Sequence, residues 1–301
     1  MRDMTDSLDA ARIAGLLASL LDGPSAAAGL LPAIEVVATT GSTNADLRER
    51  AGALRTPLLL AAERQTAGRG RAGRSWLAEP GDSLCFSLAW RFAGPLHRLS
   101  GLSLAVGVAL AECLRAPRLD GQPGTPVMLK WPNDLLVASA KLGGILIETV
   151  GATAPGGLWA VIGVGLNVRA NAERDAAIEQ PVAALSAAGS ADTLDRNALL
   201  AQLAASLAQA LDRFDRDGLA PFVARWDALH AHAGQPVSIV EQGRTLHQGV
   251  ALGIDASGCL QLDTGSGSVK VAAGDVSLRA VQGSPAATSL PNASEGPHAL
   301  H

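Results

Sequence analysis

The pattern of apolar residues changes once along the chain, and this change most constrains the fold. Between about residues 34 and 230, short apolar runs of strand length alternate with segments whose leucines recur at helical spacing. From Gly234 onward, apolar and other residues alternate with a period of two, between turns rich in glycine and serine. The first pattern predicts a sheet with inserted helices, of α/β or α+β type. The second predicts a small all-β module of barrel-like form.

These patterns also predict the individual elements and the division into domains. The predicted strands of the first part cover residues 34–38, 58–62, 84–91, 127–130, 135–137, 144–149 and 158–164. The predicted helices cover residues 7–21, 43–50, 100–114, 195–214 and 221–229. Thr43 and Asp46 have the spacing of a capping box for the second of these helices. We therefore expect a helical extension over 1–33, a larger domain over 34–232, a β domain over 233–282 and a disordered tail over 283–301.

Composition limits the classes of protein to which the chain can belong. With 301 residues, 48% of them hydrophobic, it can bury one large core and a small second one. Its formal net charge of −4 has the wrong sign for a general nucleic-acid binder. About thirty residues precede the first predicted strand, too few for a helix-turn-helix domain with its own core. We therefore expect no DNA binding.

Cysteine usage and the start of the chain predict a cytoplasmic protein. Cys85, Cys113 and Cys259 are far apart and lack metal-ligand spacing, so we expect reduced thiols. The first residues carry acidic side chains where a signal peptide has a basic start and an uninterrupted apolar run. We also expect no segment that crosses a membrane.

A loop rich in glycine and arginine follows the strand predicted at 58–62. Residues 68–76 read GRGRAGRSW and so contain GxGxxG, but the dinucleotide fingerprint needs a helix directly afterwards, and here another strand follows. The Gly-Lys-Ser/Thr ending of a P-loop is absent too. What the loop does offer is arginines, which pair with carboxylate and phosphate, on a backbone that glycine lets approach a ligand. A solvated basic loop or an RGG-like nucleic-acid segment is the alternative interpretation.

Three further segments place polar side chains at strand ends. Residues 130–134 read KWPND, in which Asn133 and Asp134 offer oxygen atoms of the kind that orient Mg²⁺ or a ribose. Lys141 enters the next strand near two glycines, which suits a phosphate or carboxylate site. Residues 163–167 read GVGLN, with a polar residue at the end of a strand. Taken singly, the three could equally be a turn, a surface lysine and a strand bend.

Together these segments resemble the bacterial biotin–protein ligase family. The matching residues are Ser42-Thr43-Asn44, 63–76, 130–134, 141–148 and 163–167, which occur in the family's order and at its spacings, within a similarity from about 34 to 279. The resemblance implies an α+β fold with a central mixed β-sheet flanked by helices, the class II synthetase-like fold of biotin and lipoate ligases. A small C-terminal SH3-like β-barrel should follow. Because the DNA-binding domain of the bifunctional members is missing, the resemblance is to the catalytic-only class.

The resemblance also implies ligand contacts, residue by residue. The biotin contacts carry over to Ser42, Thr43, Asn44, Gln65, Arg69, Gly70, Arg71 and Lys141. The ATP contacts carry over to Trp76, Lys130, Asn133, Asp134, Asn167 and Arg279. Two segments depart from the family pattern: Ala72 stands where close relatives often carry a basic residue, and the adenosine-covering loop expected at 179–188 matches only weakly. We therefore name no ligand contact in 179–188.

The implied reaction has two steps. The carboxylate of biotin attacks the α-phosphate of ATP and releases pyrophosphate, and a lysine of a biotin carboxyl carrier domain then displaces AMP from biotinyl-AMP. We expect Lys141 and Arg71 to be the catalytic residues that bridge carboxylate and α-phosphate. Asp134 would help to organise Mg²⁺, and the arginine loop would close over the mixed anhydride. Because the family often dimerises by edge-to-edge sheet contact, a homodimer is compatible with the resemblance.

Three other functions are weighed against this one. A lipoate–protein ligase shares the fold and the acyl-adenylate chemistry, but the arginine loop followed by KWPND favours biotin. A nucleic-acid-binding regulator could use the arginine loop, but the negative net charge argues against it. A degenerate ligase that serves only as a binding subunit is disfavoured because Lys141 and Arg71 are retained.

Overall fold

A seven-stranded mixed sheet forms the centre of the molecule, in a computed structural model that describes residues 7–22, 31–119, 123–151, 158–172, 175, 178, 180–186, 194–274 and 276–280. Its strands are β1 (Ala33–Thr40), β2 (Leu58–Gln65), β3 (Ser83–Phe92), β4 (Met128–Lys130), β5 (Asp134–Val137), β6 (Ala140–Val150) and β7 (Leu158–Asn167). They lie in the order β1-β2-β3-β7-β6-β5-β4; β1 and β2 are parallel and every other neighbouring pair is antiparallel. The predicted fold class is thereby confirmed. The expected tail at 283–301 lies outside the described residues.

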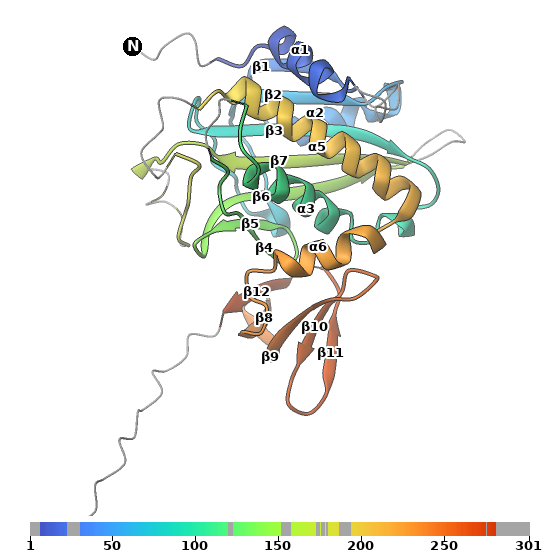
Figure 1. Cartoon of the computed structure of the whole chain (residues 1–301), viewed down its shortest axis with the longest axis vertical. Helices are drawn as coiled ribbons and strands as arrows, with labels where there is room; N and C mark the ends of the chain where they lie inside the picture. Colours follow the sequence, from blue (N-terminus) through green and yellow to red (C-terminus); the bar gives the residue numbers. More distant parts are fainter. Residues whose placement is uncertain are drawn as a thin grey trace, which may run out of the picture.

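Helices cover the sheet from both sides because successive strand residues point to opposite faces. Leu59 of β2 joins the main core, with α1 (Ala10–Leu21), α3 (Leu102–Arg115) and α5 (Arg196–Asp217) on one face (Figure 1). Its neighbours Leu58 and Leu60 pack instead with Leu47 of α2 (Thr43–Arg50) in a smaller cluster on the other face. The face under α2 is therefore less heavily covered, and the cavity described below lies there.

Three details of the helical regions differ from the sequence predictions. Ser42, and not a Thr43–Asp46 capping box, caps α2: its Oγ accepts from the backbone N–H of Ala45, while the Asp46 carboxylate accepts from Thr40 Oγ1 at 2.5 Å. The helix predicted at 221–229 is divided into a 3-10 turn, Ala220–Phe222, and α6, Val223–Ala228. In the described part of the chain, the other 3-10 turns are Ala51–Ala53, Arg71–Gly73 and Leu96–Leu99.

The third difference concerns the expectation that no segment could cross a membrane. The stretch Leu96–Arg115, which contains α3, is long and apolar enough to do so by length and composition. Half of the window that meets this test is buried inside the protein, and α3 packs against α5 and β6. A core helix between a sheet and a second helix satisfies the same criterion, and the packing of α3 is of that kind.

A second, antiparallel sheet lies below the first domain in Figure 1. Its strands are β8 (Pro236–Glu241), β9 (Arg244–Ile254), β10 (Leu260–Asp263), β11 (Ser268–Val271) and β12 (Val276–Ala280), in the order β11-β10-β9-β8-β12. Side chains connect it to the first domain: Trp131 Nε1 donates to the carbonyl of Gly258, and Asp227 accepts from the N–H of Ile254. This attachment brings β12 next to the large sheet.

The buried histidine His230 lies where the two domains join and makes stability depend on pH. Its side chain is 4% exposed, it stacks on Trp226 with ring centroids 4.6 Å apart, and neither ring nitrogen has a hydrogen-bond partner among the described residues. Burial, with a smaller contribution from His232, lowers the pKa of His230 from 6.5 to about 4. The folded protein therefore keeps the ring neutral, whereas the unfolded chain takes up a proton below pH 6.5.

We accordingly expect the unfolding free energy to fall by roughly 3 kcal/mol between pH 6.5 and pH 4 because of His230 alone. His230→Phe keeps a ring beside Trp226 but removes the titration. Denaturant unfolding at several pH values in this range measures the slope for both proteins. A variant as acid-sensitive as the parent would show that His230 is not responsible.

Candidate active site

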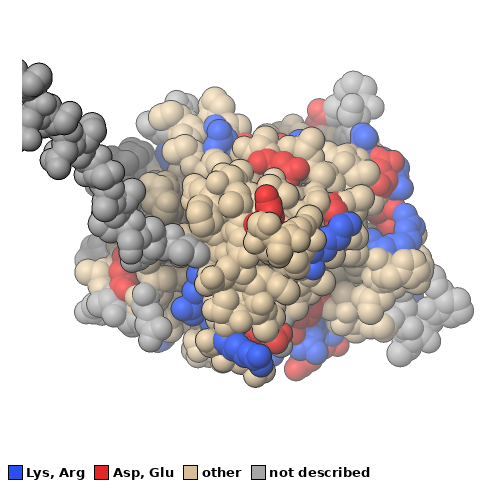
Figure 2. Space-filling model, turned by 90° about the horizontal axis from the view of Figure 1, so that it is seen from below, with Lys and Arg blue, Asp and Glu red and all other residues tan. Residues whose placement is uncertain are grey.

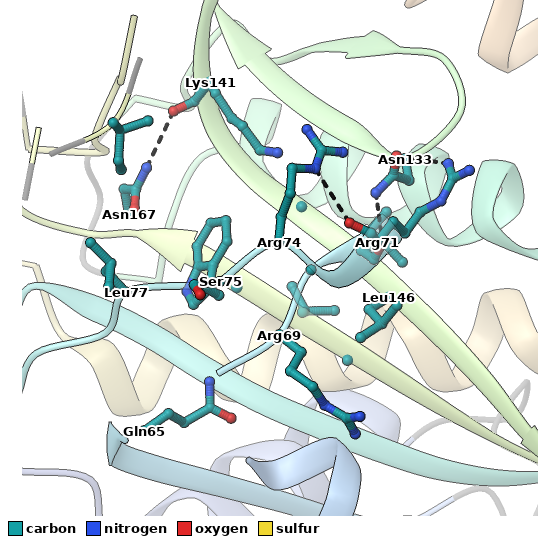
Figure 3. A pocket seen from close by; sticks show the side chains of 18 of the residues that line it. Gln65, Arg69, Arg71, Arg74, Ser75, Leu77, Asn133, Lys141, Leu146 and Asn167 are labelled. Atoms are coloured by element: carbon teal, nitrogen blue, oxygen red, sulfur yellow. Dashed lines mark hydrogen bonds between the residues drawn. The ribbon is translucent and has the colours of Figure 1, made fainter. Parts of the chain in front are cut away.

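A cavity of about 800 Å³ opens on the α2 side of the large sheet. It is bounded by the start of α2, the loop after β2, the strands β3, β6 and β7, the β4–β5 turn, residues 178 and 180–182, and the end of β12. Of the residues assigned to ligands from the sequence, the structure brings these to its lining: Ser42, Thr43, Asn44, Gln65, Arg69, Gly70, Arg71, Trp76, Lys130, Asn133, Lys141, Asn167 and Arg279. Asp134 is not in the lining and reaches the cavity through Lys141. In Figure 3, Gln65 and Arg69 lie toward one end of the cavity, and Lys141, Arg74, Arg71 and Asn133 toward the other.

The first end is a network of neutral polar groups. Gln65 Oε1 accepts from the backbone N–H of Thr43 at 2.8 Å, and Thr43 Oγ1 lies 2.7 Å from Ser87 Oγ. The Ser87 hydroxyl donates to Asn44 Oδ1 at 2.7 Å. Thr43, Asn44 and Ser87 are buried and Gln65 is half-buried, and all four are bonded to one another, so their orientations are fixed before a ligand arrives.

Two glycines of β7 make room for the cavity side chains. A Cβ atom on Gly163 would stand 2.3 Å from Asn44 Oδ1, and one on Gly165 would stand 2.4 Å from Cε2 of Trp76. Both distances are far below contact, so any larger residue would displace Asn44 or the Trp76 ring. Glycine here serves close approach, as expected for a strand that lies under a ligand or another side chain.

The arginine loop folds back on itself between β2 and Trp76. Gly70 N–H donates to the carbonyl of Arg74, Trp76 N–H donates to that of Gly68, and the backbone passes through left-handed conformations at Ala72 and Gly73. The guanidinium of Arg71 donates to Asn133 Oδ1 at 3.1 Å and to the carbonyl of Gly274. Arg71 therefore ties the loop both to the β4–β5 turn and to the C-terminal domain.

The second end of the cavity is cationic. Lys141 Nζ lies 2.8 Å from Asp134 Oδ1 and 6.0 Å from the centroid of the Trp76 ring. Burial lowers the pKa of Lys130, Asp134 opposes that shift, and the charges of Lys141, Arg74 and Arg279 add to it. Several cations around one buried carboxylate, Asp134, leave a surplus of positive charge. Such a site favours anionic ligands such as phosphate and carboxylate.

The side chain of Asn167 connects three segments beside the cationic end of the cavity. Its Nδ2 donates to the backbone carbonyls of Lys141 and Ala183, which joins the end of β7 to the start of β6 and to the segment after residue 180. Lys141 N–H in turn donates to the carbonyl of Pro181. The amide that was assigned to the nucleotide from the sequence therefore also holds Lys141 in place.

Metal binding by protein groups alone finds little support. Among the described residues, no group of three or more His, Cys, Asp or Glu side chains is placed to hold a metal ion. One carboxylate, Asp134, stands beside the cationic end of the cavity. One or two carboxylates with substrate phosphates are the usual donor set for Mg²⁺, so the residues present fit a metal that arrives with a nucleotide.

Sequence reasoning missed several residues that shape the cavity. Ser87 lies within an apolar strand and has no motif of its own, yet it links Thr43 to Asn44. Arg74 was noted only as one of the loop arginines, although its side chain lines the cavity. Ile145, Leu146 and Val164 form part of the apolar wall of the cavity. In the sequence they could not be distinguished from ordinary strand residues. A polar residue in the middle of a buried strand was the available signal for Ser87.

The chain matches known families in both of its domains. Residues 34–167 match the biotin/lipoate A/B protein ligase family, and residues 232–279 match the biotin protein ligase C-terminal domain. The fold and the cavity thus place the molecule in the class of biotin and lipoate protein ligases.

Individual relatives narrow this class. The chain is 38% identical to the bifunctional ligase/repressor BirA of Escherichia coli (strain K12) over 264 residues. The aligned region covers 87% of this chain and 76% of that protein. It is 37% identical to the biotin--[acetyl-CoA-carboxylase] ligase of Mycobacterium tuberculosis over 246 residues. The aligned region covers 81% of this chain and 88% of that ligase. The biotin protein ligase from Aquifex aeolicus in complex with biotin and ATP superimposes with a TM-score of 0.68 at 25% identity, covering 82% and 99% of the two chains. The chain belongs to the biotin protein ligase family, as the sequence motifs predicted.

Proposed function

We propose that this protein is an ATP-dependent biotin–protein ligase that makes biotinyl-AMP, releases pyrophosphate and transfers biotin to a lysine of a carrier protein. The observation that carries the proposal is one cavity with a neutral hydrogen-bonding end and a cationic end. The first end suits the ureido ring of biotin, and the second suits a carboxylate facing a triphosphate. Relatives solved with biotin and ATP support both substrates.

The chemistry asks the protein to align two anions and to neutralise them. Lys141, Arg71, Arg74 and Lys130 place positive charge where the biotin carboxylate and the α-phosphate must meet, in a site that is partly closed to water. Because charge develops on the phosphate oxygens during attack, fixed cations stabilise the transition state more than the separate substrates. No covalent protein intermediate is needed.

Mg²⁺ enters this scheme with the nucleotide. Asp134 would hold the ion, directly or through water, and the ion would supply further charge neutralisation at the phosphates. The same carboxylate orients Lys141 through their 2.8 Å contact. Asp134 therefore serves the cationic end whether or not a metal is bound.

The partner is the biotin carboxyl carrier domain of a carboxylase. Relatives named as ligases for acetyl-CoA carboxylase support this choice. Its lysine would attack the acyl carbon of biotinyl-AMP after the arginine loop has shielded that carbon from water. Homodimer formation and a cytoplasmic location stay predictions.

Two other functions, lipoate ligation and nucleic-acid binding, compete with the proposed one. The matched family includes lipoate ligases, so lipoate is the competing acid. A nucleic-acid-binding role would call for a continuous basic surface, whereas in Figure 2 Lys and Arg are interspersed with Asp and Glu over the described residues of the face shown.

We expect purified protein to catalyse ATP–pyrophosphate exchange that depends on biotin. Lipoate at the same concentration should support at most about a hundredth of that rate, because groups built to bond a ureido ring are left unpaired by an acid without one. The measurement is incorporation of labelled pyrophosphate into ATP with each acid in turn. Exchange with lipoate but not with biotin would make lipoate the substrate. Exchange with neither acid would contradict the proposed ligase activity.

A further inference from the structure

The carboxylate of Glu148 connects the neutral end of the cavity to the arginine loop. It lies on β6 with its side chain 22% exposed, and it is absent from the cavity lining. One oxygen, Oε2, accepts from Asn44 Nδ2 at 2.9 Å and lies 3.6 Å from Arg69 Nη2. The other, Oε1, accepts from Arg48 Nη1 at 2.9 Å. The same oxygen thus touches a side chain of the pocket and one of the loop.

This contact determines how the Asn44 amide faces. An ionised carboxylate only accepts hydrogen bonds, so the group that Asn44 turns toward Glu148 must be its NH₂. The carbonyl oxygen of Asn44 then faces Ser87, and it accepts the Ser87 hydroxyl proton at 2.7 Å. The backbone carbonyl of Leu146 accepts from the same Nδ2 at 3.3 Å, so Glu148, at 2.9 Å, is the nearer of two acceptors that set the orientation of this amide.

The orientation of the Asn44 amide sets which groups donate and which accept in the next hydrogen bonds, at Ser87 and Thr43. Ser87 has one hydroxyl proton and gives it to Asn44, so toward Thr43, 2.7 Å away, Ser87 can only accept. The Thr43 hydroxyl has acceptors for its own proton in Ser87 and in Gln65 Oε1, 3.1 Å away, so its oxygen faces a ligand with lone pairs. Gln65 already accepts from the backbone N–H of Thr43 through its Oε1, which leaves its NH₂ as a donor.

The cavity therefore offers an acceptor and a donor side by side. A cyclic urea carries an N–H donor beside a C=O acceptor, and it complements this pair. Had Asn44 turned over, Ser87 would be free to donate to Thr43, and that bond would occupy a lone pair of the Thr43 oxygen that the ligand could otherwise use.

We propose that Glu148 is a positioning residue for biotin selection. It fixes the hydrogen-bond direction of Asn44, Ser87 and Thr43, and it holds Arg69 so that the loop lies over the same pocket. The inference rests on the proposed function, because it assigns the urea to this end of the cavity. Glu148 does not contact the place where the biotin carboxylate would meet the α-phosphate. Lys141 and Arg71 would lie there.

The test compares Glu148→Ala with Arg48→Ala in biotin-dependent exchange. Arg48 contacts the same carboxylate from outside, through Oε1, so its loss removes a partner of Glu148 without touching Asn44 or Arg69. We expect Glu148→Ala to raise the KM for biotin about tenfold or more and to change kcat less than about threefold. Arg48→Ala should stay within about twofold of the parent in both. An equal fall of kcat and kcat/KM in Glu148→Ala would overturn the positioning role.

A double variant separates the proposed route from general damage to the fold. If Glu148 acts through Asn44, adding Glu148→Ala to Asn44→Ala should raise the KM for biotin by less than about twofold beyond Asn44→Ala alone. Fully additive effects would overturn the inference. Glu148→Gln keeps an acceptor oxygen for Asn44 but loses the charge that faces Arg69, and should give a smaller rise in KM. This isosteric variant also provides the KM comparison should the alanine variant fold poorly.

The parent protein distinguishes the two levels of the argument. Exchange in the parent with an unchanged KM in Glu148→Ala would refute the role of Glu148 and leave the biotin ligase assignment standing. A parent without any biotin-dependent exchange would refute both.

Discussion

Replacing Lys141 by alanine is expected to abolish biotin-dependent ATP–pyrophosphate exchange, with a loss of at least about a hundredfold. Its ammonium group lies between Asp134 and the Trp76 ring, at the cationic end of the cavity. Backbone bonds of Lys141 to Pro181 and Ala183 fix where β6 places this group. The measurement is the initial rate of exchange at saturating biotin and ATP.

Lys270→Ala is the matched control for this experiment. Lys270 is an exposed lysine of β11 that also pairs with an aspartate, Asp255, so the change in charge and in ion pairing is the same. We expect it to exchange at the parent rate. Because Lys141→Ala leaves the buried Asp134 without its partner, unfolding of both variants should be compared as well. A folded Lys141→Ala protein with the parent's rate would exclude Lys141 from the mechanism.

The sequence predicted most of the fold because its pattern is local. Strands that read as continuous apolar runs, such as the first five residues of Leu58–Gln65, and helices with a leucine stripe, such as Arg196–Asp217, can be recognised from about ten residues at a time. Their boundaries differ from the prediction by a few residues at the ends, where hydrogen bonding and not hydrophobicity decides. The parallel pairing of β1 with β2 could not be read from the pattern; only the family resemblance implied a mixed sheet.

The predicted site residues came together, but their contacts were not predictable. Arg71 and Lys141 line one cavity, as the proposed chemistry required. The bond from Arg71 to the carbonyl of Gly274 joins residues that are 203 positions apart, and no local pattern announces such a contact. Glu148 looked like the polar end of a matching strand segment. Its importance became visible only when Asn44 and Arg69 were found on the same oxygen.

Replacing Arg71 by alanine is expected to give an enzyme that loses its intermediate. We expect biotinyl-AMP to leave the protein at least about tenfold faster than from the parent, and the KM for biotin to rise. Two hydrogen bonds of Arg71, to Asn133 and to Gly274, hold the loop against both domains, and the same guanidinium faces the cavity in which the phosphate would lie. Without it the loop still has its internal bonds, the contact of Arg69 with Glu148 and the packing of Trp76, but not these two ties to the neighbouring segments.

The rate of loss is measured by loading the protein with labelled biotin and ATP, removing free ligand and following the label that remains bound. Arg64→Ala is the matched control: Arg64 precedes the loop by a few residues, pairs weakly with Glu79 at 3.6 Å and does not line the cavity. We expect it to retain the label as the parent does. Label lost equally slowly from Arg71→Ala, with an unchanged KM for biotin, would mean that the arginine loop neither seals the site nor binds the ligand. The arginine loop would then have no part in closing the site, even if Lys141 proved essential.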